Sequence, residues 1–211
     1  HISSIEVKFC DIGNTAEPVV MELVTMDNGY PSVDVFAQTE TDMSTAVVGA
    51  WHKFTFNPPV FVAADLDVAF VLKTNDADHA VHFAARGGYD AAAGQFIGAQ
   101  PYTVGVRFSS SNGNTWTAHQ DEDLTTRINA AIFDPTTKEV SLSILSATDM
   151  SDMIMMAEAF LPSAGTRVRF EITAGGETVS VDPFQVWERQ SYFTGSVSVK
   201  AILTGTAKLS P

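Results

Sequence analysis

The stretch Ile5-Glu6-Val7-Lys8-Phe9 places an apolar side chain at every second position, with a charged side chain between. Successive side chains of a β-strand point to opposite faces of a sheet, so this period of two predicts a strand with one buried face. The same pattern returns further along the chain, at residues 124–132, 140–144, 168–172 and 197–203. The sequence therefore predicts a chain built mainly of β-strands.

Turn-forming residues separate the strand-like runs at short intervals. These turns are predicted at Asp27-Asn28-Gly29, Asn57-Pro58-Pro59, Asn112-Gly113-Asn114 and Gly175-Gly176. Many short strands with frequent turns and little helical periodicity are typical of an all-β sandwich or barrel. A domain boundary is expected near Asp134-Pro135, between two strong strand patterns, which gives domains at 1–133 and 134–211.

Residues 147–160 (ATDMSDMIMMAEAF) fit two secondary structures. Met and Ala favour a helix, which Thr148 or Asp149 would cap at its N-terminus. The alternative is a loop at 147–152 followed by a strand that leads into Leu161-Pro162. We choose the strand, because the neighbouring segments all have strand patterns.

The charge balance excludes several classes of partner. The 211 residues include 12 Lys and Arg against 25 Asp and Glu, which gives a formal net charge of −13. This acid excess argues against binding to nucleic acid or to anionic membranes. A single cysteine, Cys10, excludes an intramolecular disulfide framework. We find neither an apolar run long enough for a membrane span nor a signal peptide, and His1 opens within a strand pattern, which indicates a fragment or a processed chain.

Sequence signatures of catalysis are absent: there is no nucleophile elbow, zinc-protease motif or P-loop. His79 and His82 would point to opposite faces of a strand, so they are not expected to hold a metal together. Asp121-Glu122-Asp123 is expected to form a solvated loop, since neighbouring acids rarely face each other across a cleft. We expect no enzymatic activity, because neither opposed carboxylates nor a nucleophile with its base can be recognised.

Asp76 and Asp78 form an acidic pair in a polar loop between two apolar runs. Calcium sites use such oxygen-rich loops, so a Ca²⁺ site is one hypothesis. The spacing of a complete calcium-binding loop is missing, and a solvated turn is the preferred interpretation. No other metal or cofactor is expected.

Aromatic residues beside predicted turns are the candidate ligand-binding residues, because flat rings stack on sugars and loops of β-sandwiches often bind ligands. These residues are Tyr30, Tyr89, Tyr102 and Trp116. The alternative is that each ring closes one end of a sandwich core, an interpretation we prefer for Trp116.

Three short strings along the first half of the chain carry a resemblance to a known family. They are Asn28–Ser32 (NGYPS), Phe54–Val60 (FTFNPPV) and Ser110–Thr117 (SSNGNTWT). In this order and spacing they resemble a module of large structural proteins in the tails of tailed bacteriophages, of the baseplate or tail-fibre type. The second half, from Leu161-Pro162 to Thr206, resembles the small β-domain that often follows such a module. The resemblance implies a virion component rather than an enzyme, and no catalytic residue is carried over.

The fold class that we predict is all-β, with two antiparallel β-sandwich domains, the first jelly-roll-like and the second Ig-like. The leading functional hypothesis is a structural component of a phage tail, located in the virion, that assembles as a homo-oligomer with other tail proteins. It could also attach the particle to a host-surface glycan. The alternative hypothesis is a carbohydrate-binding β-sandwich module of a secreted bacterial protein, which would be extracellular.

Overall fold

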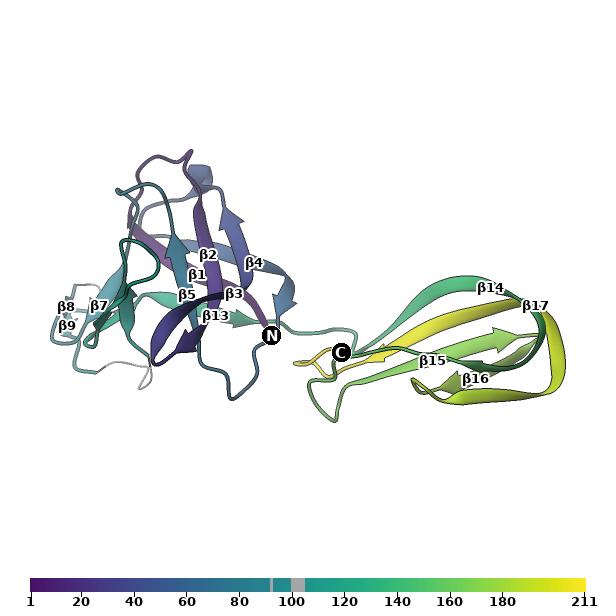
Figure 1. Cartoon of the computed structure of the whole chain (residues 1–211). Helices are drawn as coiled ribbons and strands as arrows, with labels where there is room; N and C mark the ends of the chain where they lie inside the picture. Colours follow the sequence, from purple (N-terminus) through teal and green to yellow (C-terminus); the bar gives the residue numbers. More distant parts are fainter. Residues whose placement is uncertain (92, 100–104) are drawn as a thin grey trace. The chain divides into compact units, whose positions relative to one another are not determined.

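Figure 1 shows the chain as a computed structural model, which describes residues 1–91, 93–99 and 105–211. Strands hold 59% of the described residues. Among the residues described there is no α-helix, and the helical segment present is a short 3₁₀-helix, η1 (Met43–Thr45). The strands pair antiparallel in several separate sheets. The prediction of an all-β chain is confirmed.

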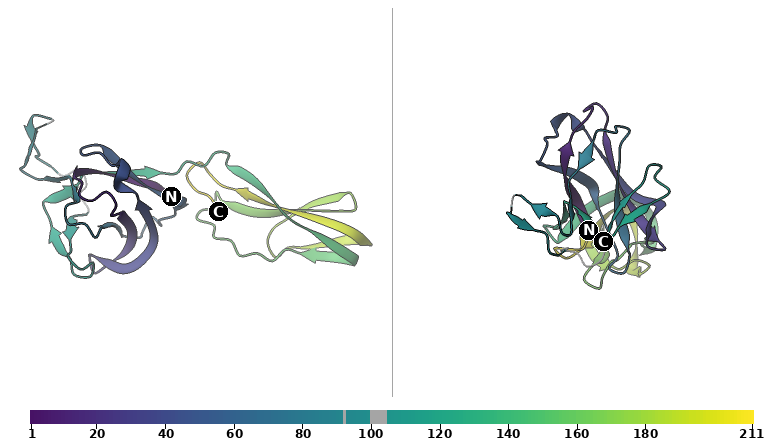
Figure 2. Two further views of the ribbon diagram at one scale, coloured as in Figure 1. Left: turned by 90° about the horizontal axis from the view of Figure 1, so that it is seen from above. Right: turned by 90° about the vertical axis from the view of Figure 1, so that its left-hand side faces the viewer.

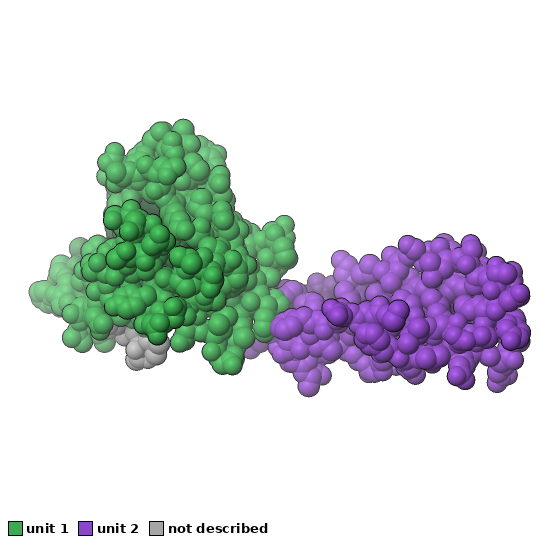
Figure 3. Space-filling view, in the orientation of Figure 1, with its two compact units in different colours: residues 1–130 green, residues 131–211 purple. Residues whose placement is uncertain are grey.

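The chain forms two compact units, His1–Ala130 and Ala131–Pro211 (Figure 3). Each unit has a hydrophobic core made only of its own residues. The division falls a few residues before the limit between 133 and 134 that the sequence analysis proposes.

The first unit contains the strands β1 to β13. They are β1 (Ile2–Asp11), β2 (Val19–Asp27), β3 (Tyr30–Thr41), β4 (Trp51–Val60), β5 (Val68–Lys73), β6 (Ala80–Val81), β7 (Phe83–Ala85), β8 (Tyr89–Asp90), β9 (Gln95–Phe96), β10 (Arg107–Ser109), β11 (Thr117–His119), β12 (Glu122–Leu124) and β13 (Thr126–Ala130).

Two sheets of the first unit share one core. One sheet has the order β13-β1-β4, with β6 paired to the far end of β1, and the other has the order β3-β2-β5. The alternating residues of β1 and β4 face the alternating residues of β2, and Met43 of η1 joins them. The buried side chains of this core are Ile5, Val7, Phe9, Val19, Met21, Leu23, Met43, Phe54 and Phe56. Burying each large apolar side chain contributes about 1.5–3 kcal/mol, which makes this core the main source of stability of the unit.

Among the described residues of the first unit there are also three two-stranded sheets: the hairpins β10–β11 and β8–β9, and the pair β7–β12, whose strands lie far apart in the sequence. The turn predicted at Asp27-Asn28-Gly29 connects β2 to β3, with Asn28 and Gly29 both at positive φ. Consecutive residues at positive φ match the right-handed twist of the flanking strands and suit a tight hairpin.

The second unit contains one sheet of four strands in the order β14-β17-β15-β16. The strands are β14 (Thr137–Ile154), β15 (Arg167–Ala174), β16 (Glu177–Val181) and β17 (Val186–Thr204). Figure 2 shows the long, curved paths of β14 and β17. Register shifts at three places along this pair mark the irregularities at which the ladder is interrupted.

The core of the second unit lies on one face of this sheet. Phe170, Ile172, Val197 and Val199 are buried there together with Trp187 from the beginning of β17. Met150 and Met153, from the later part of β14, pack against this cluster. The long β14–β17 pair therefore supplies the sheet and also part of the cover over its own apolar face.

Residues 147–160 form strand and coil, not helix, but the predicted order is wrong. The strand β14 continues through residues 147–152 to Ile154, and residues 155–162 form no strand. Asp149 has a φ of 49°, and the register shifts between Ala147 and Met150. This bulge breaks the alternation of apolar residues, so the sequence pattern looks like a loop although the strand continues.

The turn predicted at Asn57-Pro58-Pro59 is also wrong, because these residues lie inside β4. The ladder between β1 and β4 is irregular there: Ile2 pairs with Val60, whereas Ser4 pairs with Thr55. Proline lacks the N–H that a regular ladder needs, and an irregular stretch accommodates it.

Burial of the predicted apolar faces is confirmed for some strands and not for others. Ile128, Val140, Leu142 and Ile144 are exposed, although their spacing predicts a buried face. The residues 140–144 belong to β14, which lies at the edge of its sheet and is bordered by a partner strand on one side only. Alternation shows which side chains share a face but not whether that face is covered.

Candidate functional site

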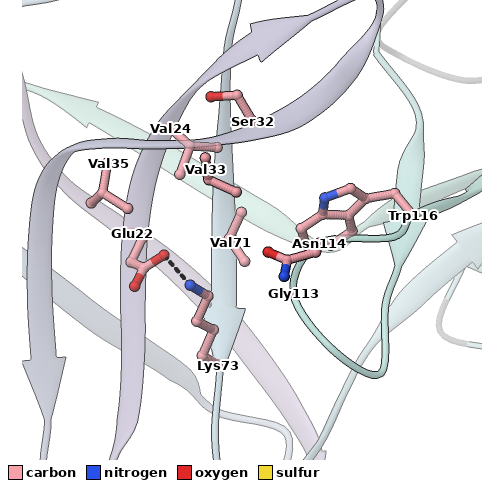
Figure 4. A pocket seen from close by; sticks show the side chains of 10 residues that line it. All are labelled: Glu22, Val24, Ser32, Val33, Val35, Val71, Lys73, Gly113, Asn114 and Trp116. Atoms are coloured by element: carbon pink, nitrogen blue, oxygen red, sulfur yellow. Dashed lines mark ion pairs between the residues drawn. The ribbon is translucent and has the colours of Figure 1, made fainter.

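A groove lies on the outer face of the sheet β3-β2-β5, away from the core (Figure 4). Met21 and Leu23 of β2 point into the core, so Glu22 between them points to the outer face. The loop between β10 and β11 covers this face and brings Asn114 and Trp116 over the strands. We refer to this hollow, lined by Glu22, Ser32, Lys73, Asn114 and Trp116 with Tyr30 at its rim, as the groove.

An ion pair forms the floor of the groove. Glu22 is only 8% exposed, and its Oε2 atom lies 2.5 Å from the Nζ atom of Lys73 on β5. Val24 and Val71 are buried on the same side and surround the carboxylate with apolar atoms. A carboxylate in such surroundings needs a charged partner, because an unpaired buried charge is strongly destabilising. Lys73 is about half exposed, so ammonium hydrogens that do not face Glu22 can reach a ligand.

The loop that carries Trp116 is held by its own side chains. The Oδ1 atom of Asn112 accepts hydrogen bonds from the backbone N–H groups of Asn114 and Thr115, at 2.9 and 2.8 Å. The Oγ atom of Ser110 accepts the N–H of Gly113 at 2.9 Å. Asn and Ser side chains that bind the following backbone fix a turn without further contacts. The position of Trp116 is therefore set before any ligand arrives, which reduces the entropy cost of binding.

A row of three aromatic rings leads from Trp116 to Tyr30. The ring of Phe108 lies 6.5 Å from that of Trp116 and 5.7 Å from that of Tyr30, measured between centroids. The Nε1 atom of Trp116 is buried and has no hydrogen-bond partner within the described part of the chain.

The groove comprises two adjoining hollows of about 110 and 740 Å³, and both are lined by Ser32, Val33, Asn114 and Trp116.

The aromatic residues predicted from the sequence fall in different places. Tyr30, which is 48% exposed, and Trp116 meet in the groove, although 86 positions separate them. Trp116 is only partly buried and is not among the buried residues of the main core. Its closing one end of a sandwich core stays a prediction. Tyr89 contacts Phe96 edge to face in the β8–β9 hairpin and does not line the groove. Tyr102 lies outside the residues that the structure describes.

Glu22, Ser32, Lys73 and Asn114 are groove residues that the sequence analysis did not identify. One signal was available for Glu22: it interrupts the apolar run Val19–Val24, where a charged side chain must be paired if it is buried. The other three carry no such signal, because their role depends on how the β10–β11 loop crosses the sheet.

Asp76 binds backbone N–H groups in the loop for which a solvated turn is predicted and a calcium site is the alternative hypothesis. Its carboxylate accepts from the backbone N of Asn14 at 2.5 Å and from that of Asp78 at 2.7 Å. These hydrogen bonds, with that from Asp78 the larger effect, hold the pKa of Asp76 below its ordinary value of 3.8. Within residues 1–91, 93–99 and 105–211, no group of three or more His, Cys, Asp or Glu side chains is arranged to hold a metal ion.

Comparisons with known proteins give no relative. No protein-family model matches the sequence, and neither the curated proteins nor the solved structures contain a significant match. In the part of the chain that the structure describes, no helix has the length and apolar character that a membrane crossing requires. The groove itself is therefore the basis for a functional proposal.

Proposed function

We propose that this chain is a structural module of a phage tail, of the baseplate or tail-fibre type, whose first unit binds a glycan on the host surface. The strings Asn28–Ser32 and Ser110–Thr117, which carry the resemblance to tail proteins, both contribute residues to the groove. The proposal includes the domain limits 1–133 and 134–211 and the jelly-roll-like and Ig-like fold types. It also includes a virion location and assembly with other tail proteins and further copies of the chain.

The observation that carries the binding proposal is the meeting of Tyr30 and Trp116 beside Glu22 and Lys73 in one groove. A sugar offers an apolar ring face, which stacks on aromatic side chains, and hydroxyl groups, which need donors and acceptors. The aromatic row supplies a surface for stacking, while Lys73, Asn114 and Ser32 supply hydrogen-bond donors and acceptors for the hydroxyl groups. Residues 1–133 hold 6 basic and 16 acidic residues, so a neutral or basic glycan suits the groove better than an acidic one.

Multivalent display would give such a site its biological effect. Many copies on one particle bind together through a high effective concentration, so a weak single site is sufficient for attachment. A carbohydrate-binding module of a secreted bacterial protein is the second candidate, and the same groove supports it. Mass spectrometry of purified particles from the source distinguishes the two, because only the tail protein is present in a virion.

A glycan array tests the binding proposal with four proteins: the unchanged chain, Trp116→Ala, Tyr30→Ala and Tyr89→Ala. We expect Trp116→Ala and Tyr30→Ala each to weaken binding at least about fivefold, since a stacked ring contributes on the order of 1 kcal/mol or more. Tyr89→Ala is the matched control, because Tyr89 is an exposed tyrosine away from the groove. Equal loss in all three variants, or no bound glycan at all, would contradict the proposal.

Calcium dependence is tested on the same array with and without a chelator. We expect no change in binding, because the carboxylate of Asp76 is engaged by backbone donors and the loop does not line the groove. Loss of binding on chelation would instead support the calcium hypothesis for Asp76 and Asp78.

A further inference from the structure

Three side chains of the first unit form a chain of contacts outside the groove. The Oγ atom of Ser109 on β10 lies 2.8 Å from the Nε2 atom of His119 on β11. The other ring nitrogen, Nδ1, lies 3.7 Å from the Oε2 atom of Glu122 on β12. A hydroxyl on one imidazole nitrogen and a carboxylate near the other is the arrangement that activates a serine nucleophile.

The hairpin register explains why these residues meet. Arg107 pairs with His119 and Ser109 pairs with Thr117, so Ser109 and His119 are diagonal neighbours on one face of the hairpin. The short turn after His119 returns the chain and places Glu122 three residues further on, beside the ring. Trp116 and Phe108 have the opposite parity and point to the other face. The contact chain is thus separate from the groove.

Arg107 holds the carboxylate in place. Its Nε atom donates to the Oε2 atom of Glu122 at 2.6 Å, and its guanidinium also contacts that oxygen through Nη2. The guanidinium lies over the ring of Phe83, with 4.8 Å between Cζ and the ring centroid. The Oε2 atom of Glu122 is therefore held between Arg107 and His119, as a positioning residue requires.

The three contact residues are partly exposed. The side chains of His119 and Glu122 are 30% and 25% exposed, and Ser109 is partly exposed. An activated serine needs this partial exposure, because a fully buried hydroxyl would not meet a substrate.

From this geometry we propose that Ser109 is an activated nucleophile that transfers the acyl group of a carboxylic ester to water. The Oγ atom attacks the carbonyl carbon while Nε2 of His119 takes the hydroxyl proton. The ester C–O bond then breaks, His119 returns the proton to the leaving alcohol, and the acyl group remains on Ser109. Water attacks this acyl group, His119 takes a proton from the water and returns it to Oγ, and the carboxylic acid is released. No other reactant is consumed.

A fluorophosphonate probe tests the nucleophile directly on the full chain. Oγ forms a bond to phosphorus and fluoride leaves, so peptide mass spectrometry locates the adduct. We expect one adduct, on Ser109, that is absent in Ser109→Ala and forms at least about 100-fold more slowly in His119→Ala, because general-base catalysis contributes that much. Ser143→Ala and His82→Ala are controls outside the contact chain and should react like the unchanged protein.

Folding of each variant is checked by circular dichroism and thermal unfolding. If His119→Ala does not fold, His119→Gln replaces it, since glutamine keeps a polar group near Ser109 but cannot act as the base. An adduct on another residue, no adduct, or undiminished labelling in the folded His119 variant would overturn the proposal.

Hydrolysis of p-nitrophenyl acetate tests turnover and the role of Glu122. Glu122→Gln keeps the shape of the side chain and removes its charge. We expect it to lower kcat at least about tenfold with little change in KM, because a positioning carboxylate acts on the reacting state. Equal hydrolysis by the unchanged protein and Ser109→Ala would overturn the proposal. The result is independent of the glycan array, because the two sites lie on opposite faces of the hairpin.

Discussion

Replacing Phe54 with alanine tests whether the two cores unfold independently. Phe54 is fully buried in the core of the first unit, where it pairs with Ile5 across the sheet. Removing its ring costs the transfer free energy of the lost atoms and leaves a cavity, together about 3–5 kcal/mol. For a unit of about this size each kcal/mol lowers Tm by roughly 3–5 °C, so we expect a decrease of about 10–20 °C.

Differential scanning calorimetry of the full chain measures this effect. Two transitions are expected, and Phe54→Ala should shift only the transition of the first unit. Ile172→Ala is the reciprocal control, since Ile172 is fully buried in the core of the second unit. It should destabilise that unit by about 2–5 kcal/mol and shift only the transition of the second unit. A single transition, or two transitions that both move with either substitution, would refute independent cores.

Three further predictions concern local features. Burial lowers the pKa of His52 below 6.5, so the folded state favours the neutral ring. This contribution to the stability of the first unit is fully present above pH 6.5 and decreases as the pH falls through the native pKa of His52. Thermal unfolding between pH 7 and 5 would detect the decrease, and His52→Gln should abolish that part of the pH dependence. Gly175→Ala should destabilise the second unit by about 1–3 kcal/mol, because its φ is +60° and the new Cβ would lie 2.9 Å from the ring of Phe193. Gly176→Ala is the control and should destabilise the unit less, since its φ is +83° but the space around the new Cβ is open. Equal losses of unfolding free energy in chemical denaturation would exclude the steric contribution. Asp76→Ala should lower the Tm of the first unit and reduce its sensitivity to acid. The native pKa of Asp76 lies below 3.8, so the stabilisation by its carboxylate is present above pH 3.8 and is lost as the pH falls further. An unchanged dependence of Tm on pH in the variant would contradict this.

Local periodicity was sufficient to predict strands but not how they are covered. Ile5, Val7 and Phe9 are buried as their spacing predicts, because β1 is paired on both sides and another sheet lies over its apolar face. Val140 and Leu142 have the same spacing and are exposed. The difference depends on which segment lies over each face, and that is decided by residues far away in the chain.

Irregular backbone limited the prediction in a different way. The bulge at Asp149 interrupts the alternation of β14, and the irregular ladder opposite Pro58 and Pro59 keeps these residues inside β4. A sequence pattern cannot distinguish a bulge from the end of a strand, because in both the alternation stops.

The groove was predictable only in its aromatic components. Tyr30 and Trp116 could be selected because rings beside turns often bind ligands, but their meeting depends on the path of the β10–β11 loop. The same holds for Ser109, His119 and Glu122, which come together through a strand register that no short motif records. Such sites become visible only when pairings between strands are known.

The pairing of Thr137 with Thr204 has a mechanical consequence. The first residue of β14 and the last residue of β17 are adjacent, so a force that pulls these residues apart acts across the strands. Hydrogen bonds between antiparallel strands lie along that direction, and they would be loaded one pair at a time rather than together. Under tension the second unit would therefore unzip from this end, with β14 leaving the edge of the sheet first, at a lower force than a unit whose terminal strands are pulled lengthwise past each other.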